Sequence, residues 1–353
     1  MATCADDRLS RALAGVSGER LATTVAALAA EPFAVRRAAD PGAVAARAWL
    51  AQRLENLGAP VLLEPFTVPF VPDVYAPPSV CWSGGALVAG RDFAVHLASA
   101  DRPGVRRGEL AVAGSGDPAG RWLVVPAGMR LFDAFGHAHG ALGLLVGRGV
   151  DADGWRYTGM SGPNPGPLAI LTLDTAVHAE LGSTAGAWLR ANAPIRRLDR
   201  AAANLHGSGS PLMLTAHAGE AAAVAVVLEA ARVLAADAGR PSVALLDGPA
   251  GARHHARRLR GSGAAPAVLH VTFDGEDDAV VVEGGGPAHA LLAAIDQAGR
   301  HTGLPLAAGR VGPGNRRYAA EGLAAVGIRA AADGPPEALA RLVVAAGLLH
   351  GAA

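Results

Sequence analysis

The chain lacks lysine and has few cysteines, few aromatic residues and no excess of charge of either sign. Its 353 residues include 31 basic side chains, all of them arginine, 31 acidic side chains and 2 cysteines. A formal net charge of zero excludes a nucleic-acid-binding protein that depends on overall positive charge. Cys4 and Cys81 are too few for a disulfide framework and lack the spacing of a zinc knuckle.

Long apolar runs and targeting segments are also missing from the sequence. No run of about 18 uncharged apolar residues occurs, so no membrane span is expected. The first residues show no basic segment followed by an apolar one, which is the pattern of a secretory signal. Hydrophobic residues make up 51% of the chain and charged residues 18%, which is typical of a folded protein. These features predict a cytoplasmic protein with no membrane or nucleic-acid partner, and they leave the oligomeric state open.

The pattern of apolar residues and turns changes twice along the chain. Residues 1–70 are expected to form helices followed by an extended segment over 61–70. Residues 71–203 alternate short apolar runs with Pro/Gly-rich turns, which is typical of a mostly-β region. From residue 204 onward, strands and helices alternate. We therefore predict one domain formed by 1–70 and 204–353 and a second domain formed by 71–203.

The alternating region predicts an α/β sandwich with a largely parallel sheet. The expected strands are 211–217, 242–247, 267–274 and 324–331, and the expected helices are 220–235, 252–260, 289–303 and 336–349. A hairpin is expected over 274–284 and a loop over 312–322. Ligands of such sheets bind beyond the carboxyl ends of the strands, where His217, Asp247 and Asp274 fall.

Four stretches together resemble the co-catalytic di-zinc aminopeptidase family, which includes glutaminyl cyclases and the transferrin-receptor ectodomain. They are residues 36–61, 120–149 with its continuation over 166–182, 204–235 and 312–328. The resemblance implies a three-layer α/β/α sandwich with a mixed, largely parallel sheet. It also implies that 71–203 is an inserted, β-rich, protease-associated-like domain.

The chain departs from this family at most of the positions that hold metal. His217 and Asp274 match two ligand positions of the family pattern. The other positions are occupied by Gly219, by Pro249 and Ala250, and by Gly314, Asn315, Arg316 and Arg317. Two metal ions need a bridging carboxylate and several ligands each, and a single zinc needs at least three protein ligands. We therefore predict a degenerate site with no metal and no cofactor.

Three residues at this edge are candidates for catalysis. His217 follows a strand and precedes a helix, where it can act as a general acid or base, or remain as a relic held by a backbone hydrogen bond. Asp274 is expected on a buried strand end, where it needs a partner or acts as a base with a raised pKa. Glu220 is expected in a first helical turn, where the helix dipole alone also favours a carboxylate.

Arginines stand where the family keeps a histidine ligand, which predicts an anion site in place of a cation site. Arg316, Arg317 and Arg253 are the expected anion-binding residues, and Asn315, Tyr318 and Asp247 the further expected substrate contacts. Packing explains Tyr318 equally, and turn formation explains Asp247. The basic run 253–260 is either a solvated helix face or a docking surface for an acidic carrier protein. His137 and His139 are interpreted as structural or surface residues and not as a metal-binding pair.

Three functions fit this pattern. The first is a repurposed, metal-independent enzyme of specialised or antibiotic metabolism that acts on a small amino-acid-derived substrate, free or held on a carrier protein. Ring closure by an internal amine with loss of sulfate or phosphate, as in aziridine formation, is one such reaction. The second is a non-catalytic pseudo-peptidase that serves as a binding protein or scaffold. The third is a divergent zinc aminopeptidase that recruits ligands from elsewhere, such as His254, His255 or Glu220.

Overall fold

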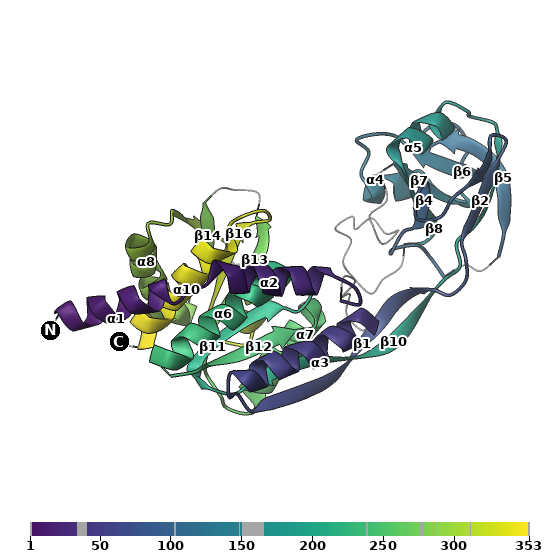
Figure 1. Ribbon diagram of the computed structural model, residues 1–353. Coiled ribbons are helices and arrows are strands. Elements are labelled where there is room, and N and C mark those ends of the chain that lie inside the picture. Colours follow the sequence, from purple (N-terminus) through teal and green to yellow (C-terminus); the bar gives the residue numbers. More distant parts are fainter. Residues whose placement is uncertain are drawn as a thin grey trace. The chain divides into compact units, whose positions relative to one another are not determined.

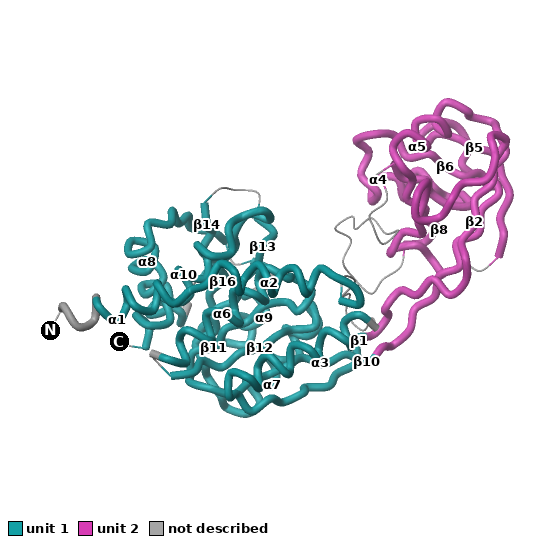
Figure 2. The backbone as a smooth tube through the Cα atoms, in the orientation of Figure 1, with its two compact units in different colours: residues 1–68, 201–353 teal, residues 69–200 magenta. Residues whose placement is uncertain are grey.

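The computed structural model divides the chain into two units, which Figure 2 colours separately. Unit 1 comprises residues 1–68 and 201–353, and unit 2 comprises residues 69–200. The structure describes residues 2–33, 41–101, 104–147, 149, 166–237, 239–275, 279–284, 286–310 and 312–351. The predicted boundaries, 70/71 and 203/204, lie within three residues of this division.

Unit 1 contains an eight-stranded mixed sheet, in the order β1-β10-β12-β11-β13-β16-β14-β15. Its strands are β1 (Val61–Val74), β10 (Ile195–Gly207), β11 (Ser210–His217), β12 (Pro241–Leu246), β13 (Ala267–Gly275), β14 (Val280–Gly284), β15 (Leu306–Gly309) and β16 (Ala325–Ala331). The run from β12 through β11 and β13 to β16 is parallel, and so is the β14–β15 pair. Antiparallel pairing joins β10 to β12 and β14 to β16.

Helices cover both faces of this sheet, which gives the three layers that the sequence predicts (Figure 1). One face packs against α1 (Ala2–Ala14), α2 (Gly18–Ala29), α3 (Pro41–Asn56), α6 (Ala221–Asp237), α8 (His289–Thr302) and α10 (Pro336–Gly351). The other face packs against α7 (Gly248–Gly261) and α9 (Pro313–Ala320). The single turn η1 (Gly286–Ala288) leads into α8. Because α6 is apolar on nearly all sides, it is buried between the sheet and the other helices of its layer.

Two local predictions are wrong. Residues 312–322 are not a loop, because Pro313 starts α9 and the helix ends before Gly322, whose φ of 78° only glycine adopts without strain. The region 274–284 is not a hairpin either, because β16 lies between β13 and β14 in the sheet. Residues 276–278, the expected hairpin turn, lie outside the described residues.

Unit 2 has its own eight-stranded sheet, in the order β3-β2-β9-β5-β6-β7-β8-β4. Its strands are β2 (Ser79–Trp82), β3 (Gly85–Leu87), β4 (Phe93–Val95), β5 (Arg106–Val112), β6 (Trp122–Val125), β7 (Gly143–Gly147), β8 (Ala169–Leu173) and β9 (Trp188–Asn192). Two short helices, α4 (Leu131–Gly136) and α5 (Thr175–Gly182), complete the unit. Apolar side chains form two separate buried clusters, one with Trp122 and one with Leu123, as the alternation of side chains along a strand requires.

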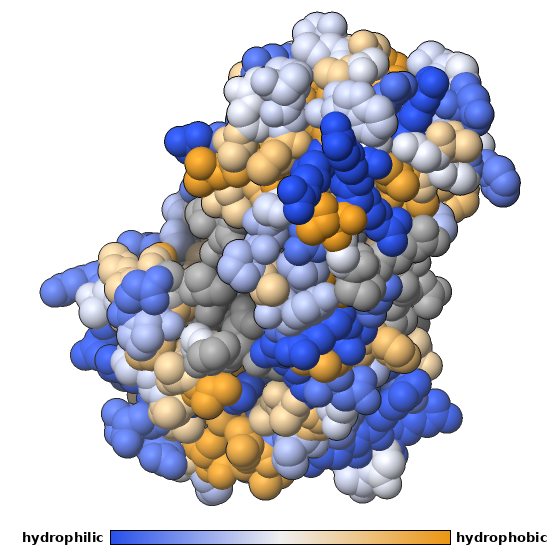
Figure 3. Space-filling model, turned by 90° about the vertical axis from the view of Figure 1, so that its right-hand side faces the viewer, coloured by the Kyte–Doolittle hydropathy of each residue, from blue (hydrophilic) through white to orange (hydrophobic). Residues whose placement is uncertain are grey.

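The described helices include none that is long and apolar enough to cross a bilayer. Figure 3 shows hydrophilic residues over much of the face that it draws, with smaller apolar areas between them. The cytoplasmic location remains a prediction.

Candidate active site

His217 is the last residue of β11 and lies at the carboxyl edge of the unit 1 sheet. The chain turns at once into α6, because the Glu220 N–H donates to the His217 carbonyl oxygen (2.9 Å). Burial lowers the pKa of His217 to about 4, while the nearby charge of Asp274 acts in the opposite direction. The imidazole is therefore neutral at pH 7. Its Nδ1 atom is buried and has no hydrogen-bond partner among the described residues, so its capacity to accept or donate a proton is not used within the described structure.

A second buried histidine, His270 on the neighbouring strand β13, packs against the His217 ring. Thr215 and His270 are paired across β11 and β13, and their side chains are hydrogen-bonded (Oγ1 to Nδ1, 2.9 Å). The His270 ring meets the His217 ring edge to face, with centroids 4.9 Å apart. Burial, and to a lesser degree the neighbouring His217, hold the pKa of His270 well below its usual value. Both rings are therefore neutral at pH 7.

Glu220 precedes the first residue of α6 and faces β13. Its carbonyl oxygen accepts from the Val224 N–H (3.0 Å), and its carboxylate accepts from the Thr272 hydroxyl (2.8 Å) and the Phe273 N–H (3.3 Å). Burial raises the pKa of this carboxyl group, and the charge of Asp274 raises it further, whereas the two hydrogen bonds lower it. A carboxyl group with a raised pKa is a candidate for proton transfer.

Asp274 is exposed, so the prediction of a buried strand end is wrong. The burial pattern along β13 changes after Val271, and the strand runs on beyond the covered part of the sheet. The charge of Asp274 nevertheless reaches the other groups at this edge, because it acts on the pKa values of His217, Glu220 and Glu283. Asp274 thus lies near enough to affect both of the other predicted catalytic residues, His217 and Glu220.

Glu283 and Arg329 form a charged pair at the same edge of the sheet. The Arg329 guanidinium lies 3.2 Å from the Glu283 carboxylate. Burial raises the pKa of Glu283, and Arg329 lowers it. The Asn315 side chain donates to the Glu283 carbonyl oxygen (2.5 Å), which ties the first turn of α9 to this site.

Three arginines lie close together on α7 and α9. Burial lowers the pKa of Arg317, and the charges of Arg253 and Arg316 lower it further, which places the three guanidinium groups near one another. Arg317 is half-buried, and the other two are exposed. Within the described part of the chain, none of the three has a carboxylate within 4.0 Å. Three such cations favour binding of an anion.

The other expected substrate contacts are engaged inside the protein. The Asp247 carboxylate is buried and forms an ion pair with Arg47 (2.8 Å). Tyr318 is fully buried, and its hydroxyl is hydrogen-bonded to His255 Nδ1 (2.9 Å). Asn315 is also buried. Their burial does not favour contact with a substrate, and such contact stays a prediction.

The carboxyl edge of the sheet does not supply a zinc site from the residues described. Among them, the one set of three His, Cys, Asp or Glu side chains whose ligand atoms all lie within 4.8 Å of one another is Glu64, His206 and His255. His217 and Asp274 are not in that set. Because zinc needs at least three protein ligands, the described residues of this edge do not fit a catalytic zinc ion.

The basic run on α7 has two sides. His255, Ala256 and Leu259 face inward, whereas Arg257 and Arg260 are exposed and both pair with Glu321 (3.7 and 3.1 Å). These pairs reduce the positive charge that a carrier protein would meet. In unit 2, His137 and His139 are exposed, as predicted.

Several polar residues of unit 1 escaped the sequence analysis, namely Arg47, Glu64, His206, Thr215, His270, Thr272, Glu283 and Arg329. Glu64 gave one usable signal, because it is a single carboxylate within an otherwise apolar extended segment. His270 gave another, since it lies in the middle of a strand that is apolar on both sides.

Comparison with solved structures identifies the fold. A zinc aminopeptidase from Bacillus subtilis superposes with a TM-score of 0.71 at 13% identity, over 94% of each chain. An aminopeptidase from Aneurinibacillus sp. strain AM-1 gives 0.65 at 15% identity, over 95% of this chain and 94% of that one. The chain has the zinc-aminopeptidase fold.

A further similar structure is a Peptidase M28 precursor from Shewanella amazonensis, with a TM-score of 0.63 at 16% identity, over 99% of this chain and 95% of that one. No protein-family model and no curated protein sequence matches the chain. The predicted aminopeptidase-like fold class is thus confirmed. The protease-associated nature of unit 2 stays a prediction.

Proposed function

We propose that this protein is a metal-independent enzyme on a peptidase-like fold that acts on a small amino-acid-derived substrate. The observation that carries the proposal is the convergence of His217, Glu220 and Asp274 at the carboxyl edge of the sheet, with the Nδ1 atom of His217 buried and unpartnered among the described residues. The carboxyl groups of Glu220, Asp274 and Glu283 can attract a substrate amine, which is cationic or becomes so during the reaction.

The reaction that fits these residues is ring closure by an internal amine. The amine nitrogen forms a bond to a carbon that carries a sulfate or phosphate group, and the carbon–oxygen bond breaks with both electrons leaving on the anion. The carboxylates stabilise the positive charge that develops on nitrogen, and His217 accepts the proton that the nitrogen loses. Arg317, with Arg253 and Arg316, provides cations for the departing anion.

The purified protein should be tested with 2-aminoalkyl sulfate and phosphate esters. We expect release of the anion, measured by ion chromatography, together with a product whose mass is lower by that of the lost acid. His217→Ala and Asp274→Asn should each lower kcat by roughly 100-fold or more. Arg317→Ala should mainly raise KM, because it weakens binding of the anion. His301→Ala, an exposed histidine on α8, is the matched control and should be unchanged.

Two results would replace the proposal. Tight binding of such amines without any turnover would favour the non-catalytic pseudo-peptidase. Hydrolysis of peptides that requires zinc and is lost in His217→Ala would favour a divergent aminopeptidase. Unchanged anion release in both His217→Ala and Asp274→Asn would remove the roles given to these residues.

A further inference from the structure

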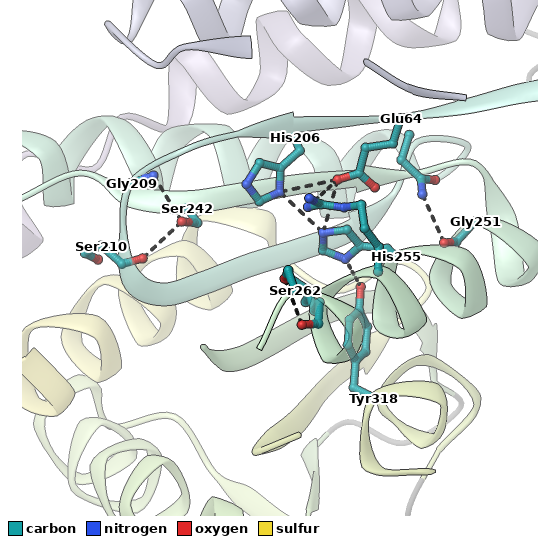
Figure 4. Close-up of polar contacts among 12 residues, drawn as sticks. Glu64, His206, Gly209, Ser210, Ser242, Gly251, His255, Ser262 and Tyr318 are labelled. Carbon is teal, nitrogen blue, oxygen red and sulfur yellow. Dashed lines mark hydrogen bonds and ion pairs between the residues drawn. The ribbon is translucent and has the colours of Figure 1, made fainter. Parts of the chain in front are cut away.

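A second cluster of titratable side chains lies in unit 1, among residues that the proposed chemistry does not use. Glu64 on β1, His206 on β10 and His255 on α7 point toward one another, as Figure 4 shows. All three residues are buried. Burying a carboxylate and two imidazoles together is costly unless they share a proton, an ion pair or a metal ion.

The three facing atoms form a nearly regular triangle. His206 Nδ1 lies 3.3 Å from His255 Nε2, and Glu64 Oε1 lies 3.8 Å and 3.7 Å from these two atoms. A point equidistant from all three lies about 2.1 Å from each of them, which is the length of a zinc–nitrogen or zinc–oxygen bond. We propose that Glu64, His206 and His255 bind one divalent transition-metal ion of the zinc class.

The protonation states suit metal binding. Burial lowers the pKa of His206 to about 4 and that of His255 to about 3, so both rings are neutral at pH 7 and their lone pairs are available. The second ring nitrogen of His255 is hydrogen-bonded to the Tyr318 hydroxyl (2.9 Å), which orients the ring with Nε2 toward the cluster. Such outer hydrogen bonds are typical of metal-bound histidines.

Arg258 competes with the metal for the carboxylate. Its guanidinium lies 2.5 Å from Glu64 Oε1, and it balances the buried negative charge when no ion is present. The Arg258 side chain is 34% exposed, so it can turn toward solvent when a cation takes its place. Metal binding is therefore an exchange of one cation for another at Glu64.

The ion would join three parts of the chain that are distant in sequence, because its ligands come from β1, β10 and α7. It would also contact the candidate active site indirectly. Tyr318 is hydrogen-bonded to Thr215, and Thr215 is hydrogen-bonded to His270 beneath His217. The metal would thus support the end of this network that lies away from His217, and its role would be structural. The proposal does not depend on the ring-closing reaction.

The test is titration of the metal-free protein, with both units present, with Co(II) and Zn(II). We expect one ion per chain and a Co(II) visible spectrum of low-symmetry, four- or five-coordinate type. His206→Ala and His255→Ala should weaken binding by roughly 100-fold, and Tyr318→Phe by roughly 10-fold. His254→Ala is the matched control on the same helix, since its ring stacks on Phe66 with centroids 5.1 Å apart, and it should bind as the wild type does.

Two further measurements keep the proposal testable if a histidine variant fails to fold. Arg258→Met should bind metal more tightly than the wild type, because it removes the competing cation. Anomalous diffraction from wild-type crystals grown with Zn(II) should place one ion between the three side chains. The proposal is overturned by absent stoichiometric binding, by binding kept in His255→Ala, by binding lost in His217→Ala, or by an anomalous peak elsewhere.

Discussion

The two units bury polar groups in different ways. Among the described residues of unit 2, the buried polar side chains are His96, Ser99 and Thr172. Each makes a hydrogen bond with a backbone atom: His96 with the Ala98 N–H, Ser99 with the Ile170 N–H, and Thr172 with the Ala94 carbonyl oxygen. These bonds tie the three side chains to the backbone of the unit 2 sheet.

Unit 1 buries more polar side chains, and more of them can change charge. Its buried polar side chains are Glu64, Asn204, His206, Thr215, Glu229, Ser242, Asp247, His255, His270, Glu283 and Asn315. Many of them face each other rather than the backbone. A fold tolerates such groups at the expense of stability, and their concentration in unit 1 is one reason why we place the proposed function there.

The largest expected difference between the units is their response to acid. His206, His217 and His255 have pKa values lowered to about 4, 4 and 3, so the unfolded chain binds protons below pH 6.5 while the folded chain does not. Stability of unit 1 is therefore lost as the pH falls from 6.5 toward 4. One pKa unit corresponds to about 1.4 kcal/mol, so the total reaches several kcal/mol. The raised pKa values of Glu64, Glu220 and Glu283 offset part of this loss.

Unit 2 should respond less over the same range, because its described residues include one buried histidine, His96, against three in unit 1. Its Asp92 has a pKa lowered to about 2 by hydrogen bonds from Arg91 and Val88, and the stability that this adds is lost only below about pH 3.8. Hydrogen exchange measured by mass spectrometry at pH 7 and pH 4.5 compares the acid response of the two units. Peptides from β11 and β13 should lose protection, and those from β6 and β7 should keep it. Equal loss in both units would contradict the comparison.

The second prediction concerns two adjacent arginines on α7. Arg258→Met leaves the buried Glu64 without its ion-pair partner and should lower the free energy of unfolding by about 3–5 kcal/mol at pH 7 in metal-free protein. Arg257→Met is the control, since its pair with Glu321 is exposed and should change stability by less than about 1 kcal/mol. Urea unfolding followed by circular dichroism measures both. Similar effects for the two variants would mean that Glu64 is not held by Arg258.

Much of the fold was predictable because the alternation of apolar strands and helices is local. Strands β11, β12, β13 and β16 and helices α6, α7, α8 and α10 all lie close to their predicted positions. Helix α9 was missed because it begins with Pro313 and Gly314, and these residue types are also typical of loops. The short strand β15 was missed because LAAG carries no periodicity.

The candidate active site was predictable where it depends on strand ends. His217 and Glu220 follow from the position of β11 and α6, since polar residues between a strand and a helix meet at the sheet edge. The Glu64 cluster was not predictable in this way. Its members come from β1, β10 and α7, and only the antiparallel β10 and the packing of α7 on the sheet bring them together.

A smaller effect is expected inside unit 2. Ser99→Ala removes the acceptor of the buried Ile170 N–H (3.0 Å) and should lower the free energy of unfolding by about 1–3 kcal/mol, independently of pH between 7 and 4.5. Ser115→Ala is the control, because that hydroxyl is exposed and donates to the Val112 carbonyl oxygen. It should change stability by less than about 0.5 kcal/mol. A pH-dependent Ser99→Ala effect would show that unit 2 also contains coupled titrating groups.

The smallest expected effects are at the surface, where the difference between the units should disappear. Arg130 pairs with Asp133 in unit 2 (3.0 Å), and Arg300 pairs with Asp296 in unit 1 (2.7 Å); both arginines are highly exposed. Water and salt screen such pairs, so Arg130→Ala and Arg300→Ala should each change the free energy of unfolding by less than about 0.5 kcal/mol. Thermal unfolding at low and high salt measures this. If Arg300→Ala alone lowers the free energy of unfolding by more than about 1 kcal/mol, the difference between the units extends to their surfaces. Equal small losses in both variants would confine that difference to the buried side chains.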